Sequence, residues 1–86
     1  MGAVRLRSVP VAPGPPRVAY AVGRSVGNAV ERNRIRRRLR AVVRAHADRL
    51  VPGTAYLVSA GPRATTMSYE ELSKAVSRLL SPGEGP

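Results

Sequence analysis

The segment from residue 28 to residue 50 constrains the fold more than any other, because it combines helical periodicity with eight arginines. On a helix of about 3.6 residues per turn, its bulky and mostly apolar residues share one side, and they are Ile35, Leu39, Val42, Val43, His46 and Leu50. The opposite side carries Asn33, Arg37, Arg40 and Arg44. The segment is therefore predicted to form a helix that buries one face and exposes a positively charged one.

The ends of this helix have recognisable signals. Asn28 and Glu31 have the spacing of a capping box, in which each side chain bonds a free backbone N–H at a helix start, so the helix is predicted to begin at Ala29. A proline and a glycine at positions 52 and 53 are predicted to end it after Leu50.

The charge of this face indicates an anionic partner. A charged helix face is most often solvated, but such faces usually mix signs, and here only Asp48 is acidic on that side. The whole chain has a net charge of +10 and a sequence pI of about 11.8, which favours nucleic acid first and an anionic membrane second. Arginine provides nearly all the cations, and its planar guanidinium can hold two phosphate oxygens at once.

Several classes of protein are disfavoured by what the sequence lacks. It has no cysteine, no apolar run near the roughly 20 residues of a membrane span and no signal-peptide pattern, so a soluble, cytoplasmic protein is expected. His46 is interpreted as a core or core-edge residue. The five acids form no catalytic pair or metal site, so we predict no catalytic residue, no metal ligand and no cofactor bound by the protein. Scarce aromatics argue against RNA-binding modules that stack bases on strands.

The rest of the chain alternates strand, loop and helix patterns, and residues 1–86 are predicted to be one domain. Strands are expected over 3–9, 17–23 and 54–60, the last covered on both sides because it is almost uniformly apolar. A proline-rich loop is expected over 10–16 and a disordered tail over 81–86. The order predicts an α+β or α/β sandwich of two layers.

Faces can be assigned within these elements. Val4 and Leu6 should point inward and Arg5 and Arg7 outward. In the second strand Val18, Tyr20 and Val22 should share one face. The other face, with Ala19, Ala21 and Gly23, is nearly bare, which fits either close packing of another element or a shallow groove for an extended ligand.

Two turns precede helices. The glycines at positions 23 and 27 bracket a turn that fits either phosphate binding by free N–H groups or an ordinary connection. Ser68 and Glu71 form a second capping box, with Met67 and Leu72 as its hydrophobic staple, so the last helix should begin at about Tyr69. Its predicted core stripe is Leu72, Val76, Leu79 and Leu80.

The segment RVAYAVGRSVGNAVERNRIRRRLRA closely resembles the protein subunit of bacterial ribonuclease P. Every position of the motif of that family is filled, by Val26, Ala29, Arg32, Asn33, Arg34, Ile35, Arg36, Arg37, Leu39 and Arg40. A weaker likeness continues through TAYLVSAGP and SYEELSKAVSRLL, so the resemblance spans most of residues 3–80.

This resemblance implies a small basic protein that binds a catalytic RNA and precursor tRNA and assists removal of the 5′ leader. The RNA would hold the Mg²⁺ ions and perform the hydrolysis, so the chain would be an accessory subunit of an endoribonuclease. The residues that would contact RNA by this likeness are Arg32, Asn33, Arg34, Arg36, Arg37 and Arg40. We add Arg24, Asn28, Arg38 and Arg44 to the expected RNA-binding set. By strand alternation alone, the leader would lie on Arg5, Arg7, Ala19 and Ala21.

The resemblance also implies a particular fold, similar to the second domain of ribosomal protein S5. It is a two-layer α/β sandwich with a small mixed sheet, in which the arginine-rich helix makes a left-handed βαβ crossover. Physical reasoning alone favours the opposite hand, because nearly all such crossovers are right-handed.

Three features depart from the usual pattern of the family. Members usually begin with a further segment that has an arginine-rich start and a helix with phenylalanines, whereas this sequence starts at about the first strand. Gly23, Arg24 and Ser25 stand where Ser-Lys-Lys is common. Arg32 projects toward the apolar side of the helix.

Three alternative functions stay open at this point. The first is a general or ribosomal RNA-binding protein, the second a membrane-surface protein built on a basic amphipathic helix, and the third a metal-dependent nuclease acting without RNA. A homo-oligomer is not predicted.

Overall fold

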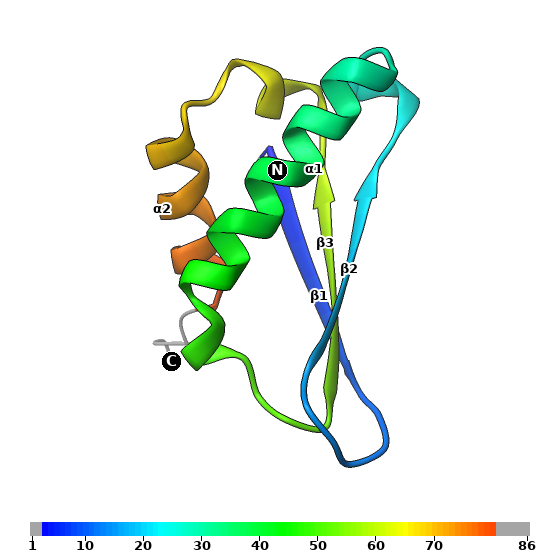
Figure 1. Cartoon of the computed structure of the whole chain (residues 1–86), viewed down its shortest axis with the longest axis vertical. Coiled ribbons are helices and arrows are strands. Elements are labelled where there is room, and N and C mark those ends of the chain that lie inside the picture. Colours follow the sequence, from blue (N-terminus) through cyan, green and yellow to red (C-terminus); the bar gives the residue numbers. More distant parts are fainter. Residues whose placement is uncertain (1–2, 81–86) are drawn as a thin grey trace.

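The computed structural model describes residues 3–80, which form three strands and two α-helices joined by short 3₁₀ turns (Figure 1). In chain order the elements are β1 (Val4–Pro10), β2 (Arg17–Val22), η1 (Arg24–Val26), α1 (Ala29–Ala45), η2 (Ala47–Arg49), β3 (Thr54–Ala60), η3 (Pro62–Thr66) and α2 (Tyr69–Leu80). The tail predicted over 81–86 lies outside the described residues.

The sheet has the strand order β1-β3-β2, with β1 antiparallel and β2 parallel to the central strand β3. Both helices cover the same face of the sheet, which gives the two predicted layers (Figure 1). In that view α1 lies in front of the sheet, and the chain passes through it from β2 on the right to β3 on the left. The crossover is therefore left-handed, as the family resemblance implied and the general handedness rule did not.

The core lies between the helices and the covered face of the sheet. Its largest fully buried side chains are Ile35, Leu39, Leu72 and Val42. The strands contribute Val4, Val22 and Val58, and Val18, Tyr20 and Leu6 pack against the cluster. The predicted apolar periodicity of α1 and the alternation of β1 and β2 are confirmed.

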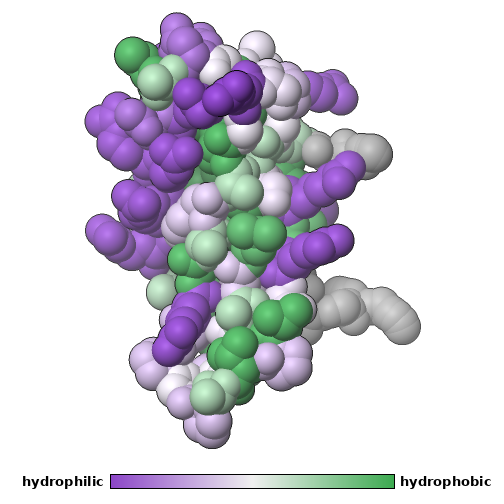
Figure 2. All heavy atoms as spheres, turned by 90° about the vertical axis from the view of Figure 1, so that its right-hand side faces the viewer, coloured by the Kyte–Doolittle hydropathy of each residue, from purple (hydrophilic) through white to green (hydrophobic). Residues whose placement is uncertain are grey.

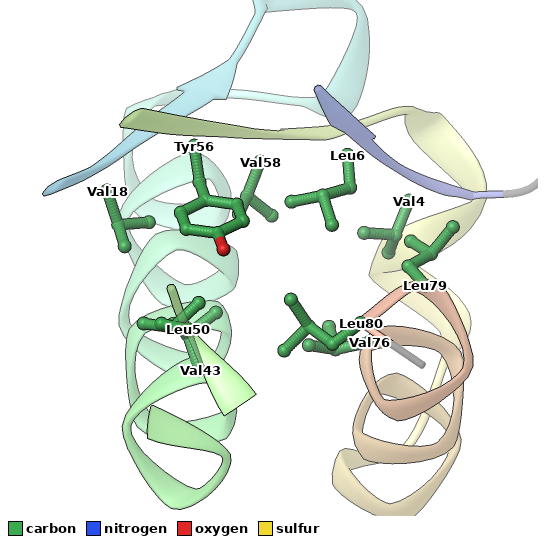
Figure 3. Close-up of a pocket in the computed structure, with 10 residues that line it drawn as sticks. All are labelled: Val4, Leu6, Val18, Val43, Leu50, Tyr56, Val58, Val76, Leu79 and Leu80. Atoms are coloured by element: carbon green, nitrogen blue, oxygen red, sulfur yellow. The ribbon is translucent and has the colours of Figure 1, made fainter. Parts of the chain in front are cut away.

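One small hollow in the core lies between the two helices and the sheet. Figure 3 shows the sheet on one side and a helix on each flank of a small apolar hollow. Tyr56 points into it from β3, and its hydroxyl accepts a hydrogen bond of 2.9 Å from the backbone N–H of Val51. Leu50 lines the same hollow, so the middle of the connection from α1 to β3 is held against the core beside Tyr56.

The prediction that the long helix continues to residue 50 is wrong, because α1 ends at Ala45. His46 leaves the helical conformation, and its Nδ1 lies 2.9 Å from the carbonyl oxygen of Val42. The chain then tightens into η2, and Arg49 donates through Nη1 to the carbonyl and hydroxyl oxygens of Ser77 on α2. Leu50 stays half-buried. Residues with apolar helical spacing therefore continue beyond the last residue of α1, so the spacing alone did not show where the helix ends. The core-edge interpretation of His46 is confirmed.

The prediction that the third strand is covered on both sides is also wrong. The side chain of Leu57 is 36% exposed, because both helices lie on the other face. The alternation was hidden because the outward residues of β3 are small or apolar. Pro10, assigned to the loop, pairs with Thr54 as the last residue of the edge strand β1, where a missing N–H is tolerated. Gly23, assigned to the second strand, follows the end of β2 and precedes η1.

Both helices begin where the capping signals predicted, but among the described residues only the box before α2 forms both of its bonds, and the box before α1 forms one. The Asn28 side-chain oxygen accepts the Glu31 N–H at 2.9 Å, and α1 begins at Ala29. At α2 both bonds of the box form between Ser68 and Glu71, at 2.8 and 3.1 Å. Of the predicted core stripe of α2, only Leu79 differs, because it is 40% exposed at the margin of the core.

Gly27 is predicted to be essential to the start of α1. Its φ is 152°, a backbone conformation that residues with a side chain rarely adopt, and an added Cβ would also displace the flexible Glu31 carboxylate. Gly27→Ala should therefore lower the free energy of unfolding, measured by urea denaturation, by about 1–3 kcal/mol. Gly23→Ala is the matched control, because no atom lies within 4 Å of its added Cβ and its φ is −83°. Equal effects of the two substitutions would contradict this account.

Candidate nucleic-acid interface

The turn before α1 places two predicted residues at the start of the helix. Val26 is buried and holds η1 against the core, which leaves Arg24 exposed beside the helix N-terminus. Asn28 is exposed, but its side-chain oxygen is engaged as the helix cap. Asn28 thus shapes the entry to the helix, and Arg24 adds a cation to it.

The exposed side of α1 forms a continuous basic surface, which we call the α1 surface. Its exposed members are Asn33, Arg34, Arg37, Arg40 and Arg44. A shallow hollow on this surface is lined by Val30, Asn33, Arg36, Arg37 and Arg40. Arg36 is half-buried and donates through Nη1 to the Asn33 side-chain oxygen at 2.8 Å, which joins the two side chains.

Val30 is a member of this surface that the sequence analysis missed. Its side chain is 74% exposed in the first turn of α1, beside the arginines of the hollow. A helical wheel that includes the first turn places Val30 on the arginine side, which is the sequence signal that could have identified it. An exposed aliphatic group among cations can contact a ribose or base while the guanidinium groups contact phosphates.

Arg40 joins the α1 surface to the edge of the sheet. Its guanidinium carbon lies 5.5 Å from the centre of the Tyr20 ring on β2, within the range of a cation–π contact. Burial raises the pKa of the Tyr20 hydroxyl above its ordinary value, against an opposing influence of Arg40 and Arg44. The ring thus provides a neutral support that limits where the Arg40 side chain can move.

Two arginines of the predicted set turn toward the protein. Arg38 is half-buried and donates through Nη1 to the carbonyl oxygen of Met67 at 3.3 Å, which connects α1 to the segment before α2. Arg32 is half-buried, as its position on the apolar side predicted, and its Nε is buried without a hydrogen-bond partner among residues 3–80. The arginines of α1 therefore divide into a group that is free to bind and a group that is partly enclosed.

Arg5, Arg7, Ala19 and Ala21 lie on the open face of the sheet, opposite the helices. The strand register places Arg7, Leu57 and Ala19 in one row and Arg5, Ser59 and Ala21 in the next. Figure 2 shows hydrophilic side chains gathered on the helix side and a second group protruding on the opposite side, with a band of neutral to hydrophobic residues, white to green, between them. Within residues 3–80, nothing packs on the two exposed alanines, so of the two alternatives for this bare face the close packing of another element is not found there.

Residues 3–80 contain no group of three His, Cys, Asp or Glu side chains that could hold a metal ion. No helix among them is long and apolar enough to cross a membrane.

Fold and surface together define a small, strongly basic two-layer α+β protein whose crossover helix presents arginine. The sequence model of the family described as Ribonuclease P matches residues 3–82, and the chain belongs to this family. A ribonuclease P protein component from a Nocardioides species is 49% identical over 72 residues, which cover 83% of this chain and 61% of that protein. The corresponding Brucella suis protein is 42% identical over 67 residues, covering 77% of this chain and 48% of the relative.

Solved structures agree on the fold. The RNase P protein from Thermotoga maritima superposes with a TM-score of 0.82 at 19% identity, over 95% of this chain and 78% of that one. The Staphylococcus aureus RNase P protein superposes with a TM-score of 0.78 at 22% identity, over 90% of this chain and 71% of that one. The chain spans about half to three fifths of the length of the first two relatives, so the likeness concerns that part of them.

Arg37 and Arg38 form a matched pair for testing which arginines bind RNA. Arg37→Gln should reduce the slope of log affinity for a labelled structured RNA against log salt by about 0.7–0.9, because one phosphate contact is lost. It should leave the free energy of unfolding almost unchanged. Arg38→Gln should lower that free energy by about 0.5–1.5 kcal/mol, because the Met67 carbonyl loses its donor. Unfolding caused by Arg37→Gln would show that the helix faces are assigned incorrectly.

Proposed function

We propose that this chain is the protein subunit of a ribonuclease P, which binds the catalytic RNA and precursor tRNA and assists RNA-catalysed removal of the 5′ leader. Its membership of the Ribonuclease P family over residues 3–82 carries this proposal. The α1 surface supports it physically, because free guanidinium groups on a rigid helix suit a phosphate backbone. We expect the complex to act in the cytoplasm.

In this proposal the protein contributes electrostatics and positioning, and the RNA contributes the chemistry. The net charge of +10 would offset phosphate repulsion where RNA subunit and substrate meet. The Mg²⁺ ions would be held by RNA groups, and no side chain of the chain is assigned a catalytic role. Arg34, Arg37, Arg40 and Arg44 are the first candidates for phosphate contacts, because they are exposed.

The open face of the sheet is the proposed path of the leader. Arg5 and Arg7 would hold phosphates at the edge strand β1. Leu57, Ala19 and Ala21 would form a low floor against which the rest of an extended strand can lie. A surface that combines cations with a smooth apolar floor accepts many sequences, because neither component reads base edges. Sequence-tolerant binding would suit leaders that differ between tRNAs.

Cleavage of precursor tRNA by ribonuclease P RNA at low Mg²⁺ tests the proposal. Addition of the chain should accelerate release of the 5′ leader at the same phosphodiester bond, because protein cations replace part of the required Mg²⁺. The double variant Arg37→Gln with Arg40→Gln should stimulate less. The control, Ala12→Asp with Val51→Glu, changes two exposed residues, one in the β1–β2 loop and one in the segment before β3 that bonds to it, and lowers the net charge equally.

Each unexpected result identifies a different alternative. RNA binding without stimulation would replace the proposal by a general or ribosomal RNA-binding role. Leader release by the chain in the absence of the RNA subunit would mean that the protein itself is a nuclease. Equal stimulation by the double variant and its control would show that the α1 surface does not make the proposed RNA contacts.

A further inference from the structure

A second basic hollow lies away from the α1 surface, between η3, α2 and the start of β1. We call it the α2 hollow, and it is lined by Ala3, Arg63, Thr66, Met67, Glu71, Lys74, Ala75 and Arg78. Three of these side chains are cations, and all three are exposed. The spacing of Glu71, Lys74 and Arg78 places them along one side of α2. Leu72 and Val76 occupy the side that faces the core.

The cations of this hollow are free to bind. In the described part of the chain, the side chains of Arg63, Lys74 and Arg78 make no hydrogen bond or ion pair. The single carboxylate in the hollow, Glu71, already accepts the Ser68 N–H as part of the helix cap. Arg49 nearby differs, because its guanidinium is held by Ser77. Three unpaired cations sharing one hollow repel one another, and a bound polyanion would relieve that repulsion.

The α2 hollow is separate from the α1 surface but continuous with the edge of the sheet. Arg40 of the α1 surface reaches Tyr20 on β2, whereas α2 lies at the opposite side of the molecule from β2 (Figure 1). A neighbouring hollow on the other side of β1 is lined by Arg5, Arg7 and Leu79. Ala3 and Arg78 in the first hollow directly precede Val4 and Leu79 in the second, so the two basic hollows adjoin. This arrangement suits an extended anion rather than a single phosphate ion.

We propose that the α2 hollow is a second RNA-contact surface, which binds the phosphate backbone of an RNA segment distinct from the one at α1. The inference rests on the proposed function only in taking RNA as the partner. A lipid surface fits less well, because the apolar stripe of α2 is used in the core and no aromatic side chain lines the hollow. With contacts on two sides, the protein joins two RNA segments.

The test compares the salt dependence of RNA affinity among three forms of the full chain. The first is the unaltered protein, and the second carries Lys74→Gln with Arg78→Gln. The third is the tip control, Ala12→Asp with Val51→Glu, which lowers the net charge by the same amount. The hollow variant should reduce the slope against log salt by about 1.4–1.8, because two phosphate contacts are lost. The tip control should keep the original slope, and thermal melting should show that all three are folded.

Separate RNA segments also predict additivity. Adding Arg37→Gln to the hollow variant should reduce the slope by the sum of the two individual losses, because independent contacts do not interact. Equal slopes for the hollow variant and the tip control would overturn the inference, because net charge alone would then explain the binding. Binding of the same forms to vesicles of phosphatidylcholine with phosphatidylserine is measured in parallel. The inference also fails if the hollow variant loses binding to these vesicles but keeps its binding to RNA. If the unaltered chain binds no RNA, both the proposed function and this inference are wrong. If the unaltered chain binds RNA and the hollow variant keeps the same slope, only the second RNA-contact surface is wrong.

Discussion

The burial of one side of α1 against the sheet is the interaction on which the rest of the structure depends. Leu39 and Val42 are fully enclosed, and burial of an aliphatic side chain of this size contributes about 1.5–3 kcal/mol. This stabilisation opposes the mutual repulsion of the arginines on the same helix. It also fixes the rotation of the helix, so the cations on its other side point into solvent as a rigid array.

The sequence predicted the parts of the fold that depend on local patterns. The buried side of α1, the faces of β1 and β2 and the first residues of both helices follow from spacing and side-chain chemistry within a few residues. Features that depend on contacts between distant segments were missed. α1 ends at Ala45, and the segment that follows it is held by the hydrogen bond from Arg49 to Ser77 on α2. Leu57 is exposed because both helices pack on the other face of the sheet. The left-handed crossover came from the family resemblance, since general rules favour the opposite hand.

The candidate site was predicted as a set of arginines, but their division into separate groups required the structure. Arg38 and Arg37 are neighbours in sequence, yet only Arg38 reaches a backbone carbonyl of the segment before α2. The cations of the α2 hollow were not singled out, because Arg63 and Arg78 are far apart in the sequence and meet only through folding. Basic groups thus lie on several sides of one small scaffold, which suits a protein that holds RNA segments together.

The most direct test of the central claim is an NMR titration of the chain with ribonuclease P RNA, observing guanidinium and methyl signals together. The Nε–Hε signals of Arg37, Arg40 and Arg44 should shift or broaden first, because these side chains are exposed. The methyl signals of Leu39 and Val42 should stay in place, because the buried side of α1 is the fixed support. Large methyl shifts with unchanged guanidinium signals would contradict the account.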